Sequence, residues 1–148
     1  MAACHNWETI KKKLGMDTKG SQVQVTEERQ GEIKLNVPGN VSFATGSSTI
    51  DAQLYPVLNR VAATLKQYPE TSVTVIGHTD NVGGEAANLN LSRERAAAVV
   101  NYLHGQGIAI DRMRAEGRGE AQPIADNSSE AGRAQNRRVE LLVRQDAG

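Results

Sequence analysis

Asp80 and Arg95 are the residues of this chain whose types and positions could bind a charged ligand. Asp80 follows the run 73–79, in which β-branched residues alternate with polar ones, and this pattern predicts a strand. Arg95 lies in a stretch from about Glu85 whose apolar spacing predicts a long helix. A carboxylate only accepts hydrogen bonds, whereas a guanidinium donates them in a planar fork. One side chain therefore suits a cation and the other an anion.

The position of Arg95 on that helix decides whether it can serve a site. It comes one residue before Ala96, which belongs to the apolar stripe, so it projects about 100° away from the stripe. It shares this flank with Leu91 and Tyr102 and could reach a ligand there. The ordinary alternatives are that Asp80 caps a turn and that Arg95 belongs to a solvated ion pair.

The remaining elements surround this strand and helix. Alternating residues over 23–37 with a turn at 29–31 predict a hairpin, and 41–43 resume a short extended piece ending at Phe43. The spacing over 51–68 predicts the first long helix, with Pro56 in its first turn. Residues 113–117 and 139–143 predict further strands, the latter near the centre of a sheet. These elements predict an α/β fold, a two-layer sandwich in which two long helices cover one face of a mixed sheet.

The length of 148 residues fits one domain with a tail. We expect residues 1–20 to form an N-terminal tail or linker with weak helical tendency from Trp7 to Leu14, and residues 21–145 to form the domain. Ala2-Ala3-Cys4 is similar to the end of a lipoprotein cleavage site, which suggests that Cys4 is acylated in the natural mature form. The alternative is an ordinary cysteine in a tail.

The composition argues against several classes of function. Seventeen basic and seventeen acidic residues cancel, and with few aromatic residues the chain is not expected to bind nucleic acid. Three scattered histidines do not have the spacing of a metal site, so we expect neither a metal nor a cofactor. An enzyme acting through His78, Asp80 or Glu85 is not favoured, because no paired carboxylates or activated nucleophile accompany them.

Several spaced polar positions resemble a known family. They are Gly77-x-Thr79-Asp80-x-x-Gly83, Asn88-x-x-Leu91-Ser92-x-x-Arg95-Ala96 and Asn136-Arg137-Arg138-Val139-Glu140. This set is similar to the OmpA-like peptidoglycan-binding domain of outer-membrane anchors, peptidoglycan-associated lipoproteins and flagellar stator proteins. The resemblance covers roughly residues 32–143, and it implies the same α/β fold.

The resemblance also implies a ligand and a set of binding residues. The ligand would be the zwitterionic end of a peptidoglycan stem peptide, usually diaminopimelate, with Asp80 at its ammonium and Arg95 at its α-carboxylate. Phe43 would border the pocket, and Asn136 or Arg137 would support its rim. Thr79, Asn81, Asn88 and Leu91 are the further candidates, because polar groups or backbone amides there could orient the ligand.

The function that follows is non-catalytic binding of peptidoglycan by a periplasmic protein, which would tether an outer-membrane lipoprotein to the cell wall. The alternative is a regulatory protein whose wall binding is coupled to an inner-membrane partner. The sequence leaves open whether the chain also binds a protein partner or forms a homodimer.

Overall fold

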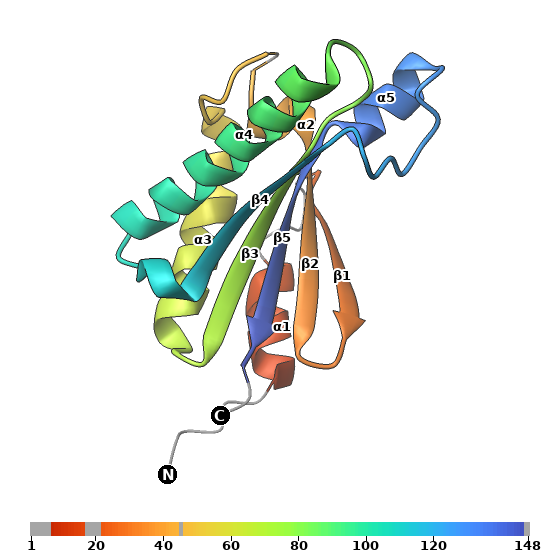
Figure 1. Ribbon diagram of the computed structural model, residues 1–148. Helices are drawn as coiled ribbons and strands as arrows, with labels where there is room; N and C mark the ends of the chain where they lie inside the picture. The colour runs from red at the N-terminus through yellow and green to blue at the C-terminus, as the bar shows by residue number, and fades with distance from the viewer. Residues whose placement is uncertain (1–6, 17–21, 45, 147–148) are drawn as a thin grey trace.

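The computed structural model describes residues 7–16, 22–44 and 46–146 (Figure 1). Its centre is a five-stranded mixed sheet in the order β1-β2-β5-β3-β4. The last strand in sequence, β5, lies in the middle and pairs antiparallel with both β2 and β3, while β3 and β4 are parallel. The predicted central position of the 139–143 strand is confirmed. The strands are β1 Gln24–Arg29, β2 Glu32–Pro38, β3 Thr71–His78, β4 Met113–Gly119 and β5 Arg138–Gln145.

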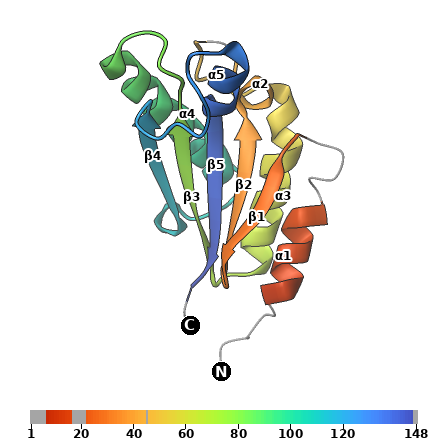
Figure 2. The same ribbon diagram turned by 90° about the vertical axis from the view of Figure 1, so that its right-hand side faces the viewer.

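Two long helices cover one face of this sheet, as Figures 1 and 2 show. The first, α3 (Tyr55–Gln67), follows the short 3₁₀ helix η1 (Ala52–Leu54) and carries Pro56 in its first turn, where no helical hydrogen bond is lost. The second, α4 (Glu85–Gly105), connects the parallel strands β3 and β4. The alternate residues Val73 and Val75 of β3 are buried with both helices in one core. The predicted two-layer α/β sandwich is confirmed.

Three short elements complete the description. They are α2 (Gly39–Ser42), the 3₁₀ helix η2 (Ile110–Arg112) and α5 (Glu130–Asn136). Figure 2 shows α5 at the upper end of the sheet, above β2 and β5. The hairpin predicted over 23–37 is β1 and β2, and Gly31 turns the chain with a φ of 87°, a conformation that favours glycine.

The helical tendency predicted from Trp7 to Leu14 corresponds to helix α1 (Trp7–Met16), but this helix packs on the domain instead of forming a tail. Trp7, Ile10 and Leu14 recur at helical spacing and are all buried in the main core, where α1 packs beside α3. The indole Nε1 of Trp7 also donates to Glu27 Oε2 on β1 at 2.9 Å. The lysine run, of which Lys12 and Lys13 are exposed, lies on the outer face of this helix.

The piece expected to be extended over 41–43 is also different. Val41 and Ser42 belong to the short helix α2, and only Phe43 is extended, in a single bridge to Ile50. The turn forms because Gly39 N donates to the Arg137 carbonyl at 2.7 Å and the Ser42 hydroxyl donates to the Pro38 carbonyl at 3.0 Å. A Cβ on Gly39 would lie 2.7 Å from that same carbonyl oxygen, so glycine is needed at this contact.

The packing of α1 can be tested by truncating Ile10, whose side chain is fully buried. We expect Ile10→Ala to lower the free energy of unfolding by about 2–5 kcal/mol, because it removes buried methylene groups and leaves a cavity. The exposed Lys12→Ala on the same helix should change it by less than about 0.5 kcal/mol. Urea denaturation measures both, and equal small effects would mean that residues 7–16 behave as a tail.

Candidate ligand-binding site

The site is positioned by the close approach of α4 to the sheet. A Cβ on Gly77 of β3 would lie 2.3 Å from the Ser92 carbonyl oxygen, and one on Gly117 of β4 would lie 2.5 Å from Arg93 N. Only glycine permits the helix backbone to come so near both strands. The buried Ser92 hydroxyl fixes the contact, since it accepts from Gly119 N at 2.9 Å and donates to the Leu89 carbonyl at 2.8 Å.

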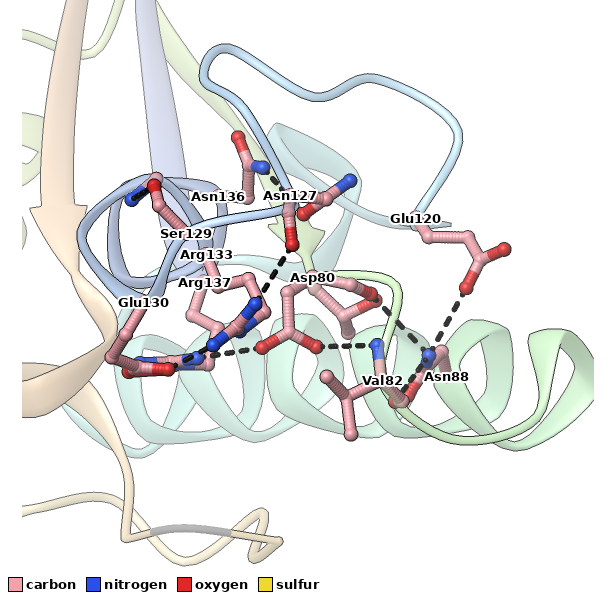
Figure 3. Close-up of polar contacts among 12 residues, drawn as sticks. Asp80, Val82, Asn88, Glu120, Asn127, Ser129, Glu130, Arg133, Asn136 and Arg137 are labelled. Atoms are coloured by element: carbon pink, nitrogen blue, oxygen red, sulfur yellow. Dashed lines mark hydrogen bonds and ion pairs between the residues drawn. The ribbon is translucent and has the colours of Figure 1, made fainter.

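Asp80 lies just beyond β3 and is buried, with 7% of its surface exposed. Its Oδ1 accepts from Val82 N at 2.9 Å, and its Oδ2 accepts from Arg137 Nη1 at 2.6 Å (Figure 3). The other end of the Arg137 guanidinium donates to Glu130 Oε2 at 2.7 Å. Hydrogen bonds from Arg137 to Glu130 and then to Asp80 raise the pKa of Arg137 above its usual value. Both oxygens of the Asp80 carboxylate are thus engaged by groups of the protein.

Thr79 and Asn88 hold the backbone around Asp80. The Thr79 hydroxyl donates to the Asp80 carbonyl at 2.9 Å, and the side-chain amide of Asn88 donates to the Val82 carbonyl at 3.0 Å. The same Asn88 amide lies within 3.3 Å of the Asp80 carbonyl and of Glu120 Oε2. These residues fix the loop that orients the carboxylate. Of the other two candidates, Asn81 is exposed and Leu91 is half-buried.

Arg95 is buried, with 8% of its surface exposed, and it faces the segment that follows α2. Its Nε donates to the Ser47 carbonyl at 2.8 Å and its Nη2 to the Ala44 carbonyl at 3.2 Å. The guanidinium carbon lies 5.2 Å from the centre of the Phe43 ring, within range of a cation–π interaction. Burial, and then the positive charge of Arg137, lower the pKa of Arg95. The structure therefore places Phe43 against Arg95.

Arg137 is the residue that connects the two halves of the site. It forms an ion pair with Asp80, and it is near enough to Arg95 to affect the pKa of that guanidinium. Among the described residues, Asp80 pairs with Arg137 and Arg95 donates to backbone carbonyls, so Asp80 and Arg95 form no ion pair with each other. The site thus contains two guanidinium groups and a buried carboxylate.

Sequence reasoning missed Glu130 as the second carboxylate on Arg137. The signal that could have found it is the Ser129-Glu130 pair, typical of a helix start, followed by Arg137 seven positions later on the same helical face. The Ser129 hydroxyl does cap α5 by accepting from Gly132 N at 3.1 Å.

Asn136 supports the loop that closes this end of the sheet. Its fully buried side chain accepts from Ile124 N at 2.7 Å and Ala125 N at 2.9 Å through Oδ1. Its amide donates to the Ala125 carbonyl at 2.9 Å and to Asn127 Oδ1 at 2.7 Å. Asn136 therefore fixes the loop before α5, and with it the start of the helix that presents Glu130.

A buried charged cluster lies beneath the same loop. Arg138 Nε donates to Glu140 Oε2 at 2.8 Å, and its Nη2 donates to the Gln122 carbonyl at 3.2 Å. His78 Nε2 is 3.3 Å from Glu140 Oε1. Burial alone would raise the pKa of Glu140, but the neighbouring His78 ring and the hydrogen-bonded Arg138 guanidinium outweigh it and lower this pKa to about 2.

Two further classes of feature are absent from the part of the chain that the structure describes. No cluster of three His, Cys, Asp or Glu side chains there could hold a metal ion. No helix in those described ranges has the length and apolarity needed to cross a membrane. Cys4 lies outside the described residues.

Comparison with known proteins places this chain in a family. The model of the OmpA family matches residues 42–137. The chain is 46% identical to the probable lipoprotein YiaD of Escherichia coli, over 88% of this chain and 59% of YiaD. It is 41% identical to the peptidoglycan-binding protein ArfA of Mycobacterium tuberculosis, over 77% of this chain and 35% of ArfA. The chain therefore spans about a third to three fifths of these relatives.

A solved structure agrees with this assignment. The cell wall anchor of the T6SS from Pseudomonas aeruginosa superimposes with a TM-score of 0.80 at 33% identity, over 95% of this chain and all of that one. The chain belongs to the OmpA family, and the resemblance inferred from its spaced polar residues is confirmed.

The Glu140 cluster predicts a specific dependence of stability on pH. The pKa of Glu140 is about 2 in the folded protein and near 4.5 otherwise, so its stabilising contribution is complete above about pH 4.5 and is lost as the pH falls toward 2. The shift corresponds to about 3 kcal/mol. We expect Glu140→Gln to flatten the fall in unfolding free energy between pH 4.5 and 2. Exposed Glu94→Gln should leave that slope unchanged, and an unaltered slope in Glu140→Gln would contradict the assignment.

Proposed function

We propose that this domain binds peptidoglycan without catalysing a reaction. It would bind the zwitterionic end of diaminopimelate in a stem peptide through ion pairs. The observation that carries the proposal is the buried Asp80 carboxylate paired with the Arg137 guanidinium, together with a second buried guanidinium, that of Arg95, in a chain of the OmpA family. The ligand's ammonium would meet Asp80, and its α-carboxylate would meet Arg95. The names of ArfA, a peptidoglycan-binding protein, and of the structural neighbour, a cell wall anchor, support the same class of ligand.

The other candidate residues either position Asp80 and Arg95 or would contact the ligand. Thr79 and Asn88 keep Asp80 in place through the loop bonds described above. Phe43 stacks against Arg95 and forms the wall beside it. Asn81 and Leu91 would contact the outer part of the ligand, Asn81 because it is exposed beside Asp80 and Leu91 because it is one turn before Arg95 on α4.

In the absence of ligand, the Arg137 guanidinium takes the place proposed for the ligand's ammonium. It donates a hydrogen bond to Asp80 Oδ2, the acceptor that the ammonium needs. We infer that binding exchanges this bond: the ammonium takes Oδ2, and Arg137 stays on Glu130 and turns its freed donors to the ligand's carboxylate beside Arg95. The buried carboxylate is then never left without a cationic partner, which would be costly.

In the cell, the domain would tether an outer-membrane lipoprotein to the wall from the periplasm. The likeness to the probable lipoprotein YiaD supports acylation at Cys4, the membrane attachment in this proposal. Weak binding to one stem peptide suffices, since the polymer offers many identical sites to an anchored protein. The likeness to an anchor of the T6SS favours one alternative, in which wall binding is coupled to a protein partner or an inner-membrane assembly.

The proposed pair can be tested by isothermal titration with a diaminopimelate stem tripeptide. Asp80→Asn and Arg95→Gln should each weaken binding by about 2–5 kcal/mol, because each removes one member of a desolvated charge pair. Exposed Asp111→Asn and Arg93→Gln are matched controls that should bind as the wild type does. Unaltered affinity in both site variants would refute the site.

Arg95→Gln also removes the hydrogen bonds to Ser47 and Ala44, so this variant should be less stable. Its binding is therefore measured well below its thermal midpoint. Asp80→Asn, which keeps the side-chain volume, is the cleaner of the two variants.

The exchange at Arg137 predicts opposite effects on two ligands. Arg137→Gln should bind the zwitterionic tripeptide roughly tenfold more weakly, because one guanidinium for the carboxylate is lost. It should bind a tripeptide whose carboxylates are amidated several-fold more tightly, because Asp80 is released to the ammonium. Exposed Arg114→Gln serves as the control. If both ligands weaken equally, Arg137 holds the fold and does not exchange.

A further inference from the structure

The two ends of the sheet carry different features. Asp80 lies just past the end at which His78 of β3 pairs with Arg138 of β5. The opposite end holds the β1–β2 turn and the start of β3, where Thr71 pairs with Gln145. β3 has eight residues, so these two ends are about 23 Å apart. The proposed peptide site is therefore about one strand length away from the β1–β2 turn.

Helix α1 is fixed near the end of the sheet that lacks the site. Figure 2 shows α1 beside the lower part of the sheet and α5 above its upper end. Trp7, the first residue of α1, donates to Glu27, which lies close to the β1–β2 turn at Gly31. Lys11, one turn later, pairs with the same carboxylate at 3.0 Å. Because Trp7 and Ile10 are buried in the main core, the start of α1 is a fixed point of the domain.

The chain between the proposed anchor and this fixed point is short. Cys4, whose acylation is part of the proposed function, precedes Trp7 by three positions. Three residues span at most about 11 Å when fully extended, which is about half the length of β3. A long flexible linker would permit every orientation of the domain, but this one is too short for the domain to turn over on its anchor.

The exposed charges at this end suit phosphate head groups. Arg29 and Arg144 both pair with Glu32 Oε2, at 3.4 and 3.2 Å. The two arginine side chains are 69% and 47% exposed, whereas Glu32 is buried. Two guanidinium groups thus share one carboxylate, which leaves a net positive charge and further donors for a phosphate. Glu70 and Asp146 lie at the same end, so the acyl anchor rather than charge provides most of the affinity.

We propose that the end of the domain formed by the start of α1, the β1–β2 turn and the end of β5 lies against the lipid head groups of the membrane, with Arg29 and Arg144 donating to their phosphates. The inference rests on the proposed function, because it takes Cys4 as the acylated anchor. The Asp80 site then points away from the membrane and is held at most roughly 35 Å above it. The domain is thus a short tether of fixed length, which attaches only to wall that comes this close.

The orientation is tested by nuclear magnetic resonance on the protein coupled through Cys4 to a lipid in nanodiscs of phosphatidylethanolamine and phosphatidylglycerol. Cys4 is the only cysteine of the sequence, so a maleimide lipid attaches there alone. A gadolinium-chelating lipid in the same nanodiscs broadens the amide signals that lie near the membrane. We expect several-fold greater broadening at Gln30 and Gly31 than at Val82 and Glu85. Equal broadening at the two ends would overturn the inference.

Two anchoring variants serve as controls. An insertion of about 20 flexible Gly and Ser residues between Asn6 and Trp7 lets the domain turn freely, so it should remove the difference between the two ends. Moving the anchor to the exposed Ala131 of α5, by combining Cys4→Ser with Ala131→Cys, should invert the difference. A difference in the original chain no larger than that of the insertion variant would refute the fixed orientation.

The lipid contact is tested by Arg29→Gln and Arg144→Gln, each of which leaves Glu32 paired with the other arginine. Each variant should reduce the broadening at Gln30 several-fold, whereas exposed Arg93→Gln should not change it. Unchanged broadening in both variants would refute the contact.

The anchor and the peptide site are tested separately. Mass spectrometry of the protein from native membranes should show an acylated Cys4, and an unmodified Cys4 would overturn the inference. The tripeptide titration is done in solution and does not depend on the anchor. Loss of tripeptide binding with the broadening difference retained would therefore refute the proposed peptide site and leave the orientation standing.

Discussion

The contact between the backbone of α4 and the two parallel strands is the constraint on which the site depends. A side chain at Gly77 would collide with the Ser92 carbonyl. The helix backbone can therefore approach the strand this closely only where the strand residue is glycine. Arg95 follows Ser92 by about one turn, and Asp80 follows Gly77 just past the strand end. This packing contact of the fold therefore fixes the elements that carry the two candidate side chains.

The charged side chains of the candidate site are hydrogen-bonded to other groups of the protein. Asp80 is buried, and an unpaired carboxylate there would destabilise the fold. Arg137 provides the positive charge that pairs with it. Arg95 is held over Phe43 by backbone carbonyls, which leaves part of its guanidinium fork for another acceptor. Side chains held by such bonds would lose less conformational entropy on binding a ligand.

The sequence predicted those parts of the fold that follow from local periodicity. The strand before Asp80 and the long helix carrying Arg95 both have clear apolar spacing, and the structure contains both. The sequence predicted only a weak helical tendency from Trp7 to Leu14 and not the packing of helix α1, because its stability comes from distant contacts with α3 and Glu27. The turn of α2 was missed for the same reason, since its anchor is the carbonyl of Arg137, far away in sequence.

The same limit applies to the site. Residue types and spacing indicated Asp80 and Arg95 through a family resemblance, but the ion pair between Asp80 and Arg137 joins two segments that no local pattern relates. This pair also sets the energetics of the proposed binding. In the proposed binding, a ligand ammonium would replace a guanidinium that is already hydrogen-bonded, so the broken bond would offset part of the energy of the new contact. Attachment to a polymer would then be strengthened by the same contact repeated along the wall. A site of this kind can release and rebind one unit while the protein as a whole stays attached.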